Sequence, residues 1–524
     1  MFARTKRAVA QYERIQRWSQ ATGKPGMNTL AREASALFQM PEKPPLWESL
    51  TPEQLATLGD PERPLLGKVV TPYDPDYETA RQLFNQAFQK YPQLIVYCEC
   101  ADDVRRCLEF AHQHSLRVTC RSGGHSTAGY SANNGGMIID VSQIRYCVVD
   151  EGQKRARVGA GTPLDLLNAV LDGYGLHVPG GGCGDVAVAG HMMGGGYGFT
   201  SREYGMNCDA LRGATVMLAD GRIVHASAKE HTELFWALRG GTGNNFGVLL
   251  ELEYELYHLR EVWGFGIQWS IDQAPEALQQ LQEHYTKEGA SDRLGYLAVV
   301  MSQPGKHGRP PKQVLVMRGM YHGEESEGRK ELAPLLKTGH LAISKRGTYR
   351  YLNDSLVADI PELPPNSPYL ANQMAGYVGR KLRRDEWASA IEYFKTSPVF
   401  RVKNGNEEQN MSLTFILIEP YGGAINRVPP HDTAFVHRDV YMDFSWISMW
   451  LEESQRAEAQ KWLTGFVQPA KPLLNGQSYQ NYPYPETPDY AQRYWSSNLD
   501  KLEKIRRHYD PKDFFHFPQS VPMP

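Results

Sequence analysis

Glycine is concentrated in one short stretch of this chain of 524 residues. Residues 179–198 read PGGGCGDVAVAGHMMGGGYG, and a single cysteine, Cys183, lies among the glycines. Glycine has no Cβ, so its backbone turns sharply and can approach another group closely. A stretch of this kind favours a backbone that packs tightly against a neighbouring loop or a ligand.

A second glycine loop lies earlier in the chain. Residues 121–129 read RSGGHSTAG and directly follow a predicted strand. Successive backbone N–H groups in such a loop can converge on an anion, and a pyrophosphate would fit. An ordinary tight turn is the alternative for a lone Gly-Gly pair. The loop matches neither G-x-G-x-x-G nor G-x-x-x-x-G-K-[ST], so nothing supports NAD or ATP in their usual cradles.

A third loop, residues 236–248, reads WALRGGTGNNFGV and could clamp the edge of a flat heterocycle. Taken alone, it would be a turn. The first two loops carry His125 and Cys183, whose imidazole nitrogen and thiolate are nucleophiles. Two nucleophiles, each inside a glycine loop, suit covalent attachment of a planar cofactor.

The residues around these loops predict a mixture of strands and helices. Residues 94–97 and 116–120 read as strands, and helical spacing of apolar residues predicts a helix over 102–114 between them. Strand, helix and strand of these lengths form a βαβ unit. Further elements are a strand at 137–141, a helix opened by Thr162-Pro163, and a strand at 248–256 with alternating leucine or tyrosine and glutamate.

The second half of the chain has a different pattern. Its strands are not regularly interleaved with helices, which favours an antiparallel sheet with helices on one side. Expected strands lie at 265–271, 294–301, 313–321, 411–419 and 435–445, and expected helices at 325–337, 384–395 and 452–466. The tail adds a helix with Leu502, Ile505 and Tyr509 on one face.

Composition excludes several classes of protein. Lys+Arg total 56 and Asp+Glu 59, so there is no basic excess of the kind that attracts nucleic acid or a membrane surface. No apolar run of signal-peptide or membrane-spanning length is present, so we expect a soluble, cytoplasmic chain, secreted only if a leader has been removed. The seven cysteines are too sparse and odd in number for a disulfide framework, and no metal site is expected.

The three loops, in this order, resemble the covalent FAD-linked oxidases of the vanillyl-alcohol oxidase fold, specifically the berberine bridge enzyme-like branch. That branch includes glucooligosaccharide oxidases and terminal oxidases of antibiotic pathways. The resemblance spans residues 75–257 in strong form. It continues through 419–427 (EPYGGAINR) and 434–438 (AFVHR), and ends in Tyr479-Gln-Asn481-Tyr482 and in 509–514 (YDPKDF).

The resemblance implies an α+β fold with a two-part FAD-binding domain and a substrate domain in which helices back an antiparallel sheet. The implied divisions are an N-terminal extension (1–70), the FAD-binding domain (71–257), the substrate domain (258–477) and a C-terminal segment (478–524) that returns to the FAD domain. Residues 1–70 read as helical at first and then as proline-rich.

The resemblance also implies a bicovalent cofactor. His125 would be bonded to the flavin's benzenoid methyl group, and Cys183 to the adjacent ring carbon. Valine at Val186 would border the oxygen-access site, as in oxidases, although a plain packing valine is equally expected. The other implied FAD contacts are Arg121, Ser122, Gly123, Gly124, Ser126, Gly129, Gly190, Gly194, Gly195, Gly196, Tyr197, Gly198, Asn245, Phe246, Gly247, Val248 and Asn481.

Oxidation of an alcohol or hemiacetal by a flavin needs a group that accepts the hydroxyl proton. Tyr479 is the leading base by resemblance, although a free phenol has a pKa near 10 and would need help to act near neutrality. Asp443 is a candidate second carboxylate that polarises this hydroxyl, and Tyr482 is another candidate. The strand around Asp443 does not match cleanly the family strand that carries a Gln or Glu active-site partner.

Three functions remain open on the sequence. The first is an FAD oxidase that takes hydride from an alcohol or hemiacetal carbon to flavin N5 and makes H2O2 from O2, with a carbohydrate or other hydroxylated small molecule as substrate. The second is a flavoenzyme that tailors a secondary metabolite by ring closure or dehydrogenation. The third is a flavin-binding protein without turnover. The sequence does not indicate an oligomeric state.

Overall fold

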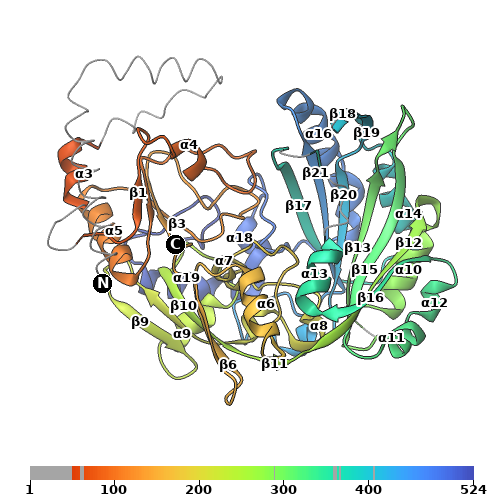
Figure 1. Cartoon of the computed structure of the whole chain (residues 1–524), viewed down its shortest axis with the longest axis horizontal. Helices are drawn as coiled ribbons and strands as arrows, with labels where there is room; N and C mark the ends of the chain where they lie inside the picture. The colour runs from red at the N-terminus through yellow and green to blue at the C-terminus, as the bar shows by residue number, and fades with distance from the viewer. Residues whose placement is uncertain are drawn as a thin grey trace.

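The computed structural model describes residues 50–58, 64–287, 289–357, 363–364, 367–404 and 407–523 (Figure 1). Most of the expected N-terminal extension, residues 1–49 and 59–63, lies outside these ranges. Within the described residues, no helix combines the length and the apolar character that crossing a membrane requires.

The first sheet is built around the strand that precedes the His125 loop. Both β2 and β3 run parallel to β4, which lies between them. The expected βαβ unit is therefore present as strand, helix and strand, but its two strands are not neighbours. The order is β1-β2-β4-β3, and the elements are β1 (Lys68–Val70), α4 (Tyr77–Ala80), β2 (Leu94–Tyr97), α5 (Ala101–Gln113), β3 (Val118–Arg121) and β4 (Met137–Asp140).

The second sheet is antiparallel and has the order β5-β6-β10-β8-β9. On β10 the predicted alternation holds, because Leu250, Leu252 and Tyr254 are buried while the glutamates between them are half-buried. Its strands are β5 (Cys147–Asp150), β6 (Arg155–Gly159), β8 (Leu211–Met217), β9 (Ile223–Ser227) and β10 (Val248–Glu255), and a separate pair joins β7 (Leu176–His177) to β11 (Tyr257–His258).

Short helices connect this sheet to the glycine loops. The helix expected after Thr162-Pro163 is α6, which buries Leu164, Leu167 and Leu171. Thr162 does not cap it, because the Thr162 hydroxyl instead donates to the carbonyl of Tyr146 (3.0 Å). The helices are α6 (Leu164–Asp172), α7 (Val188–Met193), α8 (Ser201–Tyr204) and α9 (Thr232–Leu238).

A seven-stranded antiparallel sheet forms the second half of the molecule, in the order β16-β12-β15-β13-β20-β21-β17. Its strands are β12 (Glu261–Ser270), β13 (Leu294–Gln303), β15 (Lys312–Tyr321), β16 (His340–Thr348), β17 (Leu370–Val378), β20 (Thr414–Pro420) and β21 (Met442–Trp450). A small sheet, β14-β19-β18, consists of β14 (Gly305–Lys306), β18 (Phe400–Asn404) and β19 (Glu407–Met411).

In the seven-stranded sheet, β16 and β17 were not expected from the sequence, and β21 begins seven residues later than expected. Residues 435–441 are a loop rather than a strand. Arg438 is fully buried in this loop and forms a bidentate ion pair with Asp209 at 2.7 Å for each bond. This buried pair holds the loop against the first half of the chain, so its alternating pattern does not form a strand.

Helices cover one face of the seven-stranded sheet, as Figure 1 shows. Residues Ile416 and Ile418 of β20 share a buried cluster with α10, α14 and α16. The expected helix over 325–337 is two short helices that meet at Leu332, just before Pro334. The helices are α10 (Ala274–His284), α11 (Glu325–Glu331), α12 (Ala333–Leu336), α14 (Arg384–Phe394), α15 (Ala424–Arg427), α16 (Glu453–Gly465) and α17 (Val467–Ala470).

One further helix, α13 (Tyr349–Val357), was not expected from the sequence. It lies between the two halves of the molecule, beside α6 (Figure 1). Leu352 and Leu356 of this helix pack with Phe199 from the first half. Its polar residues consequently reach the Cys183 loop, as described below.

The tail returns to the first half of the chain, as expected. It contains α18 (Tyr490–Trp495) and α19 (Leu499–Tyr509). Phe515 bridges to Val118 of β3, and the backbone N–H of Val521 donates to the Asn245 side chain at 2.8 Å. The segment that carries Tyr479 is thereby anchored on the sheet that carries the glycine loops.

Candidate active site

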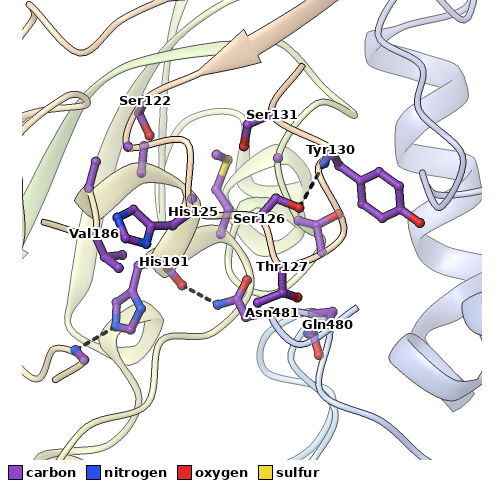
Figure 2. A pocket seen from close by; sticks show the side chains of 18 of the residues that line it. Ser122, His125, Ser126, Thr127, Tyr130, Ser131, Val186, His191, Gln480 and Asn481 are labelled. Carbon is purple, nitrogen blue, oxygen red and sulfur yellow. Dashed lines mark hydrogen bonds between the residues drawn. The ribbon is translucent and has the colours of Figure 1, made fainter. Parts of the chain in front are cut away.

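A cavity of about 380 Å3 lies between the two halves of the molecule (Figure 2). Loops from the first half, helix α7, strands of the seven-stranded sheet and the C-terminal segment all contribute to its wall. Its volume is typical of a pocket for an organic ligand. Sixteen of the residues singled out from the sequence line it: Arg121, Ser122, Gly123, Gly124, His125, Ser126, Cys183, Val186, Gly190, Tyr197, Gly198, Gly247, Val248, Tyr479, Asn481 and Tyr482.

The loop 121–129 contributes backbone donors to this cavity. Within the described part of the chain, the backbone N–H groups of residues 122–127 have no hydrogen-bond acceptor. Gly124 has φ +72°, a conformation that glycine adopts readily. Unpaired backbone donors are costly when they are covered. A ligand with several acceptor oxygens, such as a pyrophosphate, would satisfy them.

The loop is held firmly where it leaves β3. Arg121 is buried, with its guanidinium paired to Asp140 and donating to the carbonyl of Ala80 (2.8 Å). The charge of Arg121 is therefore compensated inside the protein, and its role is to anchor the loop. The side chain of Asn244 also accepts from the N–H of Cys120 (2.7 Å), which joins the third glycine loop to the first.

His125 has a defined orientation in the cavity wall (Figure 2). Its side chain is only 14 % exposed, and its Nε2 lies 3.1 Å from Oδ2 of Asp185. The ring stacks on Phe84, with centroids 4.2 Å apart and planes inclined by 24°. These two contacts fix both the plane and the rotation of the imidazole.

Cys183 is one of seven free cysteines and the exposed one among them. Two residues of α13 hold its loop, because Tyr349 donates to the carbonyl of Gly180 (3.0 Å) and Asn353 to that of Gly182 (2.9 Å). Although the thiol borders open space in the cavity, desolvation by the surrounding wall raises its pKa to about 11, and the nearby carboxylates of Asp185 and Glu419 add to this effect.

Val186 lies in the same wall as His125 (Figure 2). It is half-buried, and its backbone carbonyl accepts a hydrogen bond from the N–H of Leu164 at 2.9 Å. Val186 therefore both anchors α6 and presents an apolar side chain to the cavity.

The glycines of the second loop have two different roles. Gly190 lines the cavity, and a Cβ placed on it would have no atom within 4 Å. Gly194, Gly195 and Gly196 do not line it. A Cβ on Gly194 would lie 1.9 Å from Oδ1 of Asn481, and one on Gly195 would lie 2.7 Å from the Phe435 ring. Gly194 thus allows the C-terminal segment to pack closely, and Gly195 does so for the loop after Thr433. A Cβ on Gly196 would lie 2.6 Å from Cβ of Asn207.

Three other expected ligand residues also lie outside the cavity wall. A Cβ on Gly129 would meet Phe88 at 2.5 Å, so this glycine serves packing. Asn245 is fully buried, donates to the carbonyl of Gly241 (2.9 Å) and accepts from Val521. Phe246 is a buried member of the core. The third loop reaches the cavity instead through Thr242, Gly243 and Asn244, together with the expected Gly247 and Val248.

His191 is a cavity residue that the sequence analysis did not select. Its Nε2 accepts from the N–H of Gly181 (3.1 Å), and burial lowers its pKa to about 4. Asn481 donates to the backbone carbonyl of His191 (3.0 Å), as Figure 2 shows. The neutral imidazole thus supports the Cys183 loop and connects it to the C-terminal segment.

Tyr479 lies in the wall but is poorly suited to losing its proton. Its hydroxyl oxygen accepts from the N–H of Gly196 (2.9 Å) and from the side-chain amide of Asn481 (3.1 Å). These bonds favour the phenolate, but burial is the larger effect and raises the pKa of Tyr479, which Glu419 raises further.

Glu419 is the carboxylate at the cavity, and the sequence analysis did not select it. It lies on β20, and its Oε1 accepts a hydrogen bond from the hydroxyl of Tyr482 (3.0 Å). Its Oε2 is buried without a partner among the described residues. Burial raises the pKa of Glu419 to about 7, and the bond from Tyr482 opposes this shift.

Asp443 does not occupy the expected place beside Tyr479. It lies on β21, directly opposite Glu419 in the register, and outside the cavity wall. Neither of its oxygens has a hydrogen-bond partner among the described residues. Burial and the charge of Glu419 raise its pKa well above the usual range, so Asp443 is neutral near pH 7. The signal for Glu419 was available, because it is a lone acid in an otherwise apolar strand.

The face of the sheet explains why Glu419 reaches the cavity. Side chains alternate along a strand, and Ile416 and Ile418 face the covering helices. Glu419 therefore faces the opposite side, together with Leu297 of β13 and Gln373 of β17, both of which also line the cavity. One face of the sheet thus forms the wall opposite the glycine loops.

Two family models match this chain at the segments that build the cavity. Residues 92–227 match the FAD binding domain, and residues 478–522 match the berberine and berberine like segment. The first match contains His125 and Cys183, and the second contains Tyr479 and Asn481. The chain is an FAD-linked oxidoreductase with an FAD-binding domain and a berberine-like C-terminal segment. Its cofactor is FAD, and it is an enzyme.

Full-length relatives agree with this assignment. An uncharacterized FAD-linked oxidoreductase of Bacillus subtilis, YgaK, is 27% identical over 466 residues, which cover 87% of this chain and 97% of the relative. A chitooligosaccharide oxidase of Gibberella zeae is 28% identical over 448 residues, covering 82% of this chain and 87% of the relative.

Solved structures share the vanillyl-alcohol oxidase type of fold. The berberine bridge enzyme-like 1 protein of Physcomitrella patens superposes with a TM-score of 0.77 at 22% identity, covering 87% of this chain and 97% of that chain. A glucooligosaccharide oxidase of Acremonium strictum, described with a 6-S-cysteinyl, 8α-N1-histidyl FAD, superposes with a TM-score of 0.75 at 22% identity, covering 90% and 99%.

The cavity of this FAD-linked oxidoreductase fits the cofactor. The unpaired N–H groups of residues 122–127 suit the pyrophosphate, and the open space around Gly190 leaves room for a flat ring system. Within the described residues, no group of histidine, cysteine and acidic side chains could hold a metal ion.

Substitutions of Gly198 and Gly190 should distinguish a glycine that is needed for backbone packing from one that leaves space for the cofactor. A Cβ on Gly198 would lie 1.7 Å from the carbonyl oxygen of Gly180, which is backbone and cannot move aside, so Gly198→Ala should destabilise the protein by about 3 kcal/mol or more. Gly190→Ala should keep the stability of the apoprotein but bind less FAD. Thermal unfolding and the flavin-to-protein absorbance ratio measure the two effects. Equal stability of both apoproteins would contradict this assignment of roles.

Proposed function

We propose that this protein is an FAD-dependent oxidase whose cofactor is attached through both His125 and Cys183. The observation that carries the proposal is that an imidazole and a thiol from separate glycine loops line one cavity inside the FAD-binding match. The glucooligosaccharide oxidase with a cysteinyl and histidyl FAD supports the same arrangement. When bound, the flavin would accept a hydride at N5 from an alcohol or hemiacetal carbon and pass the electrons to O2, giving H2O2.

The residues of the chain would divide the work of holding this cofactor. The donors of residues 122–127 would bind the pyrophosphate, while His125 and Cys183 would fix the benzenoid edge of the ring system. The apolar side chain of Val186, in the same wall as His125, would leave room for O2 beside the ring. Valine makes no hydrogen bond with water, which suits a small apolar gas.

We propose Glu419, rather than Tyr479, as the group that takes the substrate's hydroxyl proton. A general base works best when its pKa lies near the working pH. The pKa of Glu419 is raised to about 7, whereas burial raises the pKa of Tyr479 further away from neutrality. The free oxygen Oε2 supplies the acceptor. Tyr482 would orient the carboxylate through its bond to Oε1, and Asp443, protonated behind it, would keep a second negative charge out of the site.

The substrate is proposed to be a hydroxylated small molecule, with oligosaccharides favoured by the relatives. The names of two relatives, a chitooligosaccharide oxidase and a glucooligosaccharide oxidase, indicate substrates of this kind. A second candidate is an aromatic or polycyclic secondary metabolite. It is favoured by the cavity wall, to which Phe84, Leu297 and Tyr369 contribute apolar and aromatic surface.

The expected domain boundaries are retained as part of this proposal. The two smaller sheets that carry the glycine loops lie within 71–257 once β1 is set aside, and the seven-stranded sheet lies within 258–477. We place the C-terminal segment at 478–524. We also propose that the protein acts in the cytoplasm.

Oxygen consumption tests the proposed reaction. Purified protein should be yellow, and it should release H2O2 with one class of compound in a panel of mono- and oligosaccharides, aromatic alcohols and glycosylated polycyclic compounds. Peroxide with sugars supports the first candidate, and turnover only with polycyclic compounds supports the second. Substrate-reduced flavin that O2 fails to reoxidise would refute the oxidase assignment.

A further inference from the structure

The contact between His125 and Asp185 distinguishes the two nitrogens of the imidazole. Oδ2 of Asp185 lies 3.1 Å from Nε2. An ionised carboxylate can only accept hydrogen bonds, so Nε2 must carry the proton of the neutral ring. Nδ1 then holds the lone pair, and among the described residues it has no hydrogen-bond partner.

Asp185 is suited to this role by its surroundings. Its side chain is 68 % exposed, and the hydrogen bond from His125 holds its pKa below the usual value, so it stays ionised. The stacking of His125 on Phe84 holds the plane of the imidazole while Nε2 faces the carboxylate. Because Asp185 and Phe84 together orient the imidazole of His125, Nδ1 is the nitrogen whose lone pair can act as the nucleophile.

We propose that Asp185 is a positioning residue for covalent attachment of the flavin to His125, and that it directs the attachment to Nδ1. This inference rests on the proposed function, because it requires His125 to be a point of attachment. Nothing in the glycine pattern identified Asp185, which is two residues after Cys183.

The attachment reaction explains why a carboxylate at Nε2 would help. A C–N bond forms between Nδ1 and the flavin methyl carbon, and one C–H bond of that methyl group breaks. The two electrons of the C–H bond stay on the flavin, which becomes reduced and takes up two protons, one from the methyl carbon and one from the imidazole. O2 then takes two electrons and two protons from the flavin and becomes H2O2.

During this step the imidazole passes through a cation, because Nδ1 forms its new bond while Nε2 still carries a proton. The Asp185 carboxylate stabilises that positive charge and accepts the proton that leaves Nε2, and this proton reaches the reduced flavin through solvent. A carboxylate beside a reacting histidine has this same effect in hydrolases, where it fixes the tautomer and stabilises the imidazolium.

The test uses the full chain with Cys183→Ala, so that His125 is the remaining attachment point. In this background Asp185→Asn should slow the appearance of FAD on the His125 peptide by about 10²-fold, and Asp185→Glu should restore most of the rate. The readouts are acid-stable flavin over time, peptide mass, and NMR of the isolated histidyl flavin, which should show the Nδ1 isomer.

Asp165→Asn is the matched control. Asp165 is an acid whose backbone N–H donates to the carbonyl of Gly184 in the same loop (2.8 Å), and its carboxylate accepts from the N–H of Leu166 (2.6 Å). It should attach flavin at the parental rate. An unchanged rate in Asp185→Asn, or attachment through Nε2, would overturn the role of Asp185 while leaving the proposed function intact. If the Cys183→Ala parent carries no flavin on His125, the proposed bicovalent function itself fails.

Discussion

Replacing both His125 and Cys183 by alanine should remove every covalent bond between the protein and its flavin. Each single variant should retain one bond, because the two side chains reach the cavity from separate loops. The two loops have separate supports as well, since Asp140 pairs with Arg121 at the first and Asn353 bonds to Gly182 at the second. Loss of one attachment should therefore leave the other loop in place.

The measurement is the mass of the flavin-bearing peptide after acid precipitation and digestion. Cys147→Ala is a suitable control, because Cys147 is a free, half-buried cysteine on β5 outside the cavity wall. It should keep both bonds. Covalent flavin that persists in the double variant would show that the attachment points lie elsewhere.

The His125→Ala variant should also reveal a pH dependence. The thiolate is the attacking form of cysteine, and desolvation raises the pKa of Cys183 to about 11. Only a small fraction is ionised at pH 7, and that fraction rises about tenfold for each pH unit below the pKa. Attachment through Cys183 alone should accelerate accordingly between pH 7 and 10.

The sequence predicted the loops of the site better than it predicted the surroundings of the substrate. His125 and Cys183 could be found because each is a nucleophile inside a glycine-rich segment, and that is a local feature. Glu419 is a single acid whose importance depends on facing the glycine loops across the molecule. Only the register of β20 within its sheet shows that it does so.

The glycines show a second limit of sequence patterns. Gly190 and Gly198 belong to one cluster, yet one borders open cavity and the other allows two backbone segments to touch. The pattern predicts that glycine is needed but not what lies opposite each residue. Likewise, α13 was not expected, although Tyr349 and Asn353 hold the Cys183 loop, because its contacts come from the far end of the chain.

Asp443 was selected as a carboxylate that could polarise the hydroxyl of Tyr479. The structure does not give Asp443 this role, because Glu419 on the neighbouring strand β20 occupies the position at the cavity. The two acids lie directly opposite each other in the pairing of β20 with β21. Two buried carboxyl groups this close disfavour each other's ionisation. One acid is thus able to serve as a base because the other remains protonated, a relation that no single strand reveals.

Substitution of Glu419 by glutamine should slow reduction of the flavin by substrate by about 10²–10⁴-fold, the range of general-base assistance. Glutamine keeps the size of the side chain and can still accept from Tyr482, so the fold and the flavin spectrum should be preserved. The pKa of Glu419 is raised to about 7, so the parent enzyme should become faster as pH rises through this value, when the carboxylate forms. Glu419→Gln should lose that dependence.

Tyr479→Phe is the decisive comparison. It removes the acceptor for Gly196 and Asn481, and so should disturb the segment that covers the cavity and slow reduction moderately. The rise in rate near pH 7 should nevertheless persist, because the base is still present. Anaerobic single-turnover reduction at several pH values measures both variants. If Tyr479→Phe abolishes the pH dependence while Glu419→Gln retains it, the phenol of Tyr479 is the base, and the high pKa imposed by burial must be lowered when the flavin occupies the cavity.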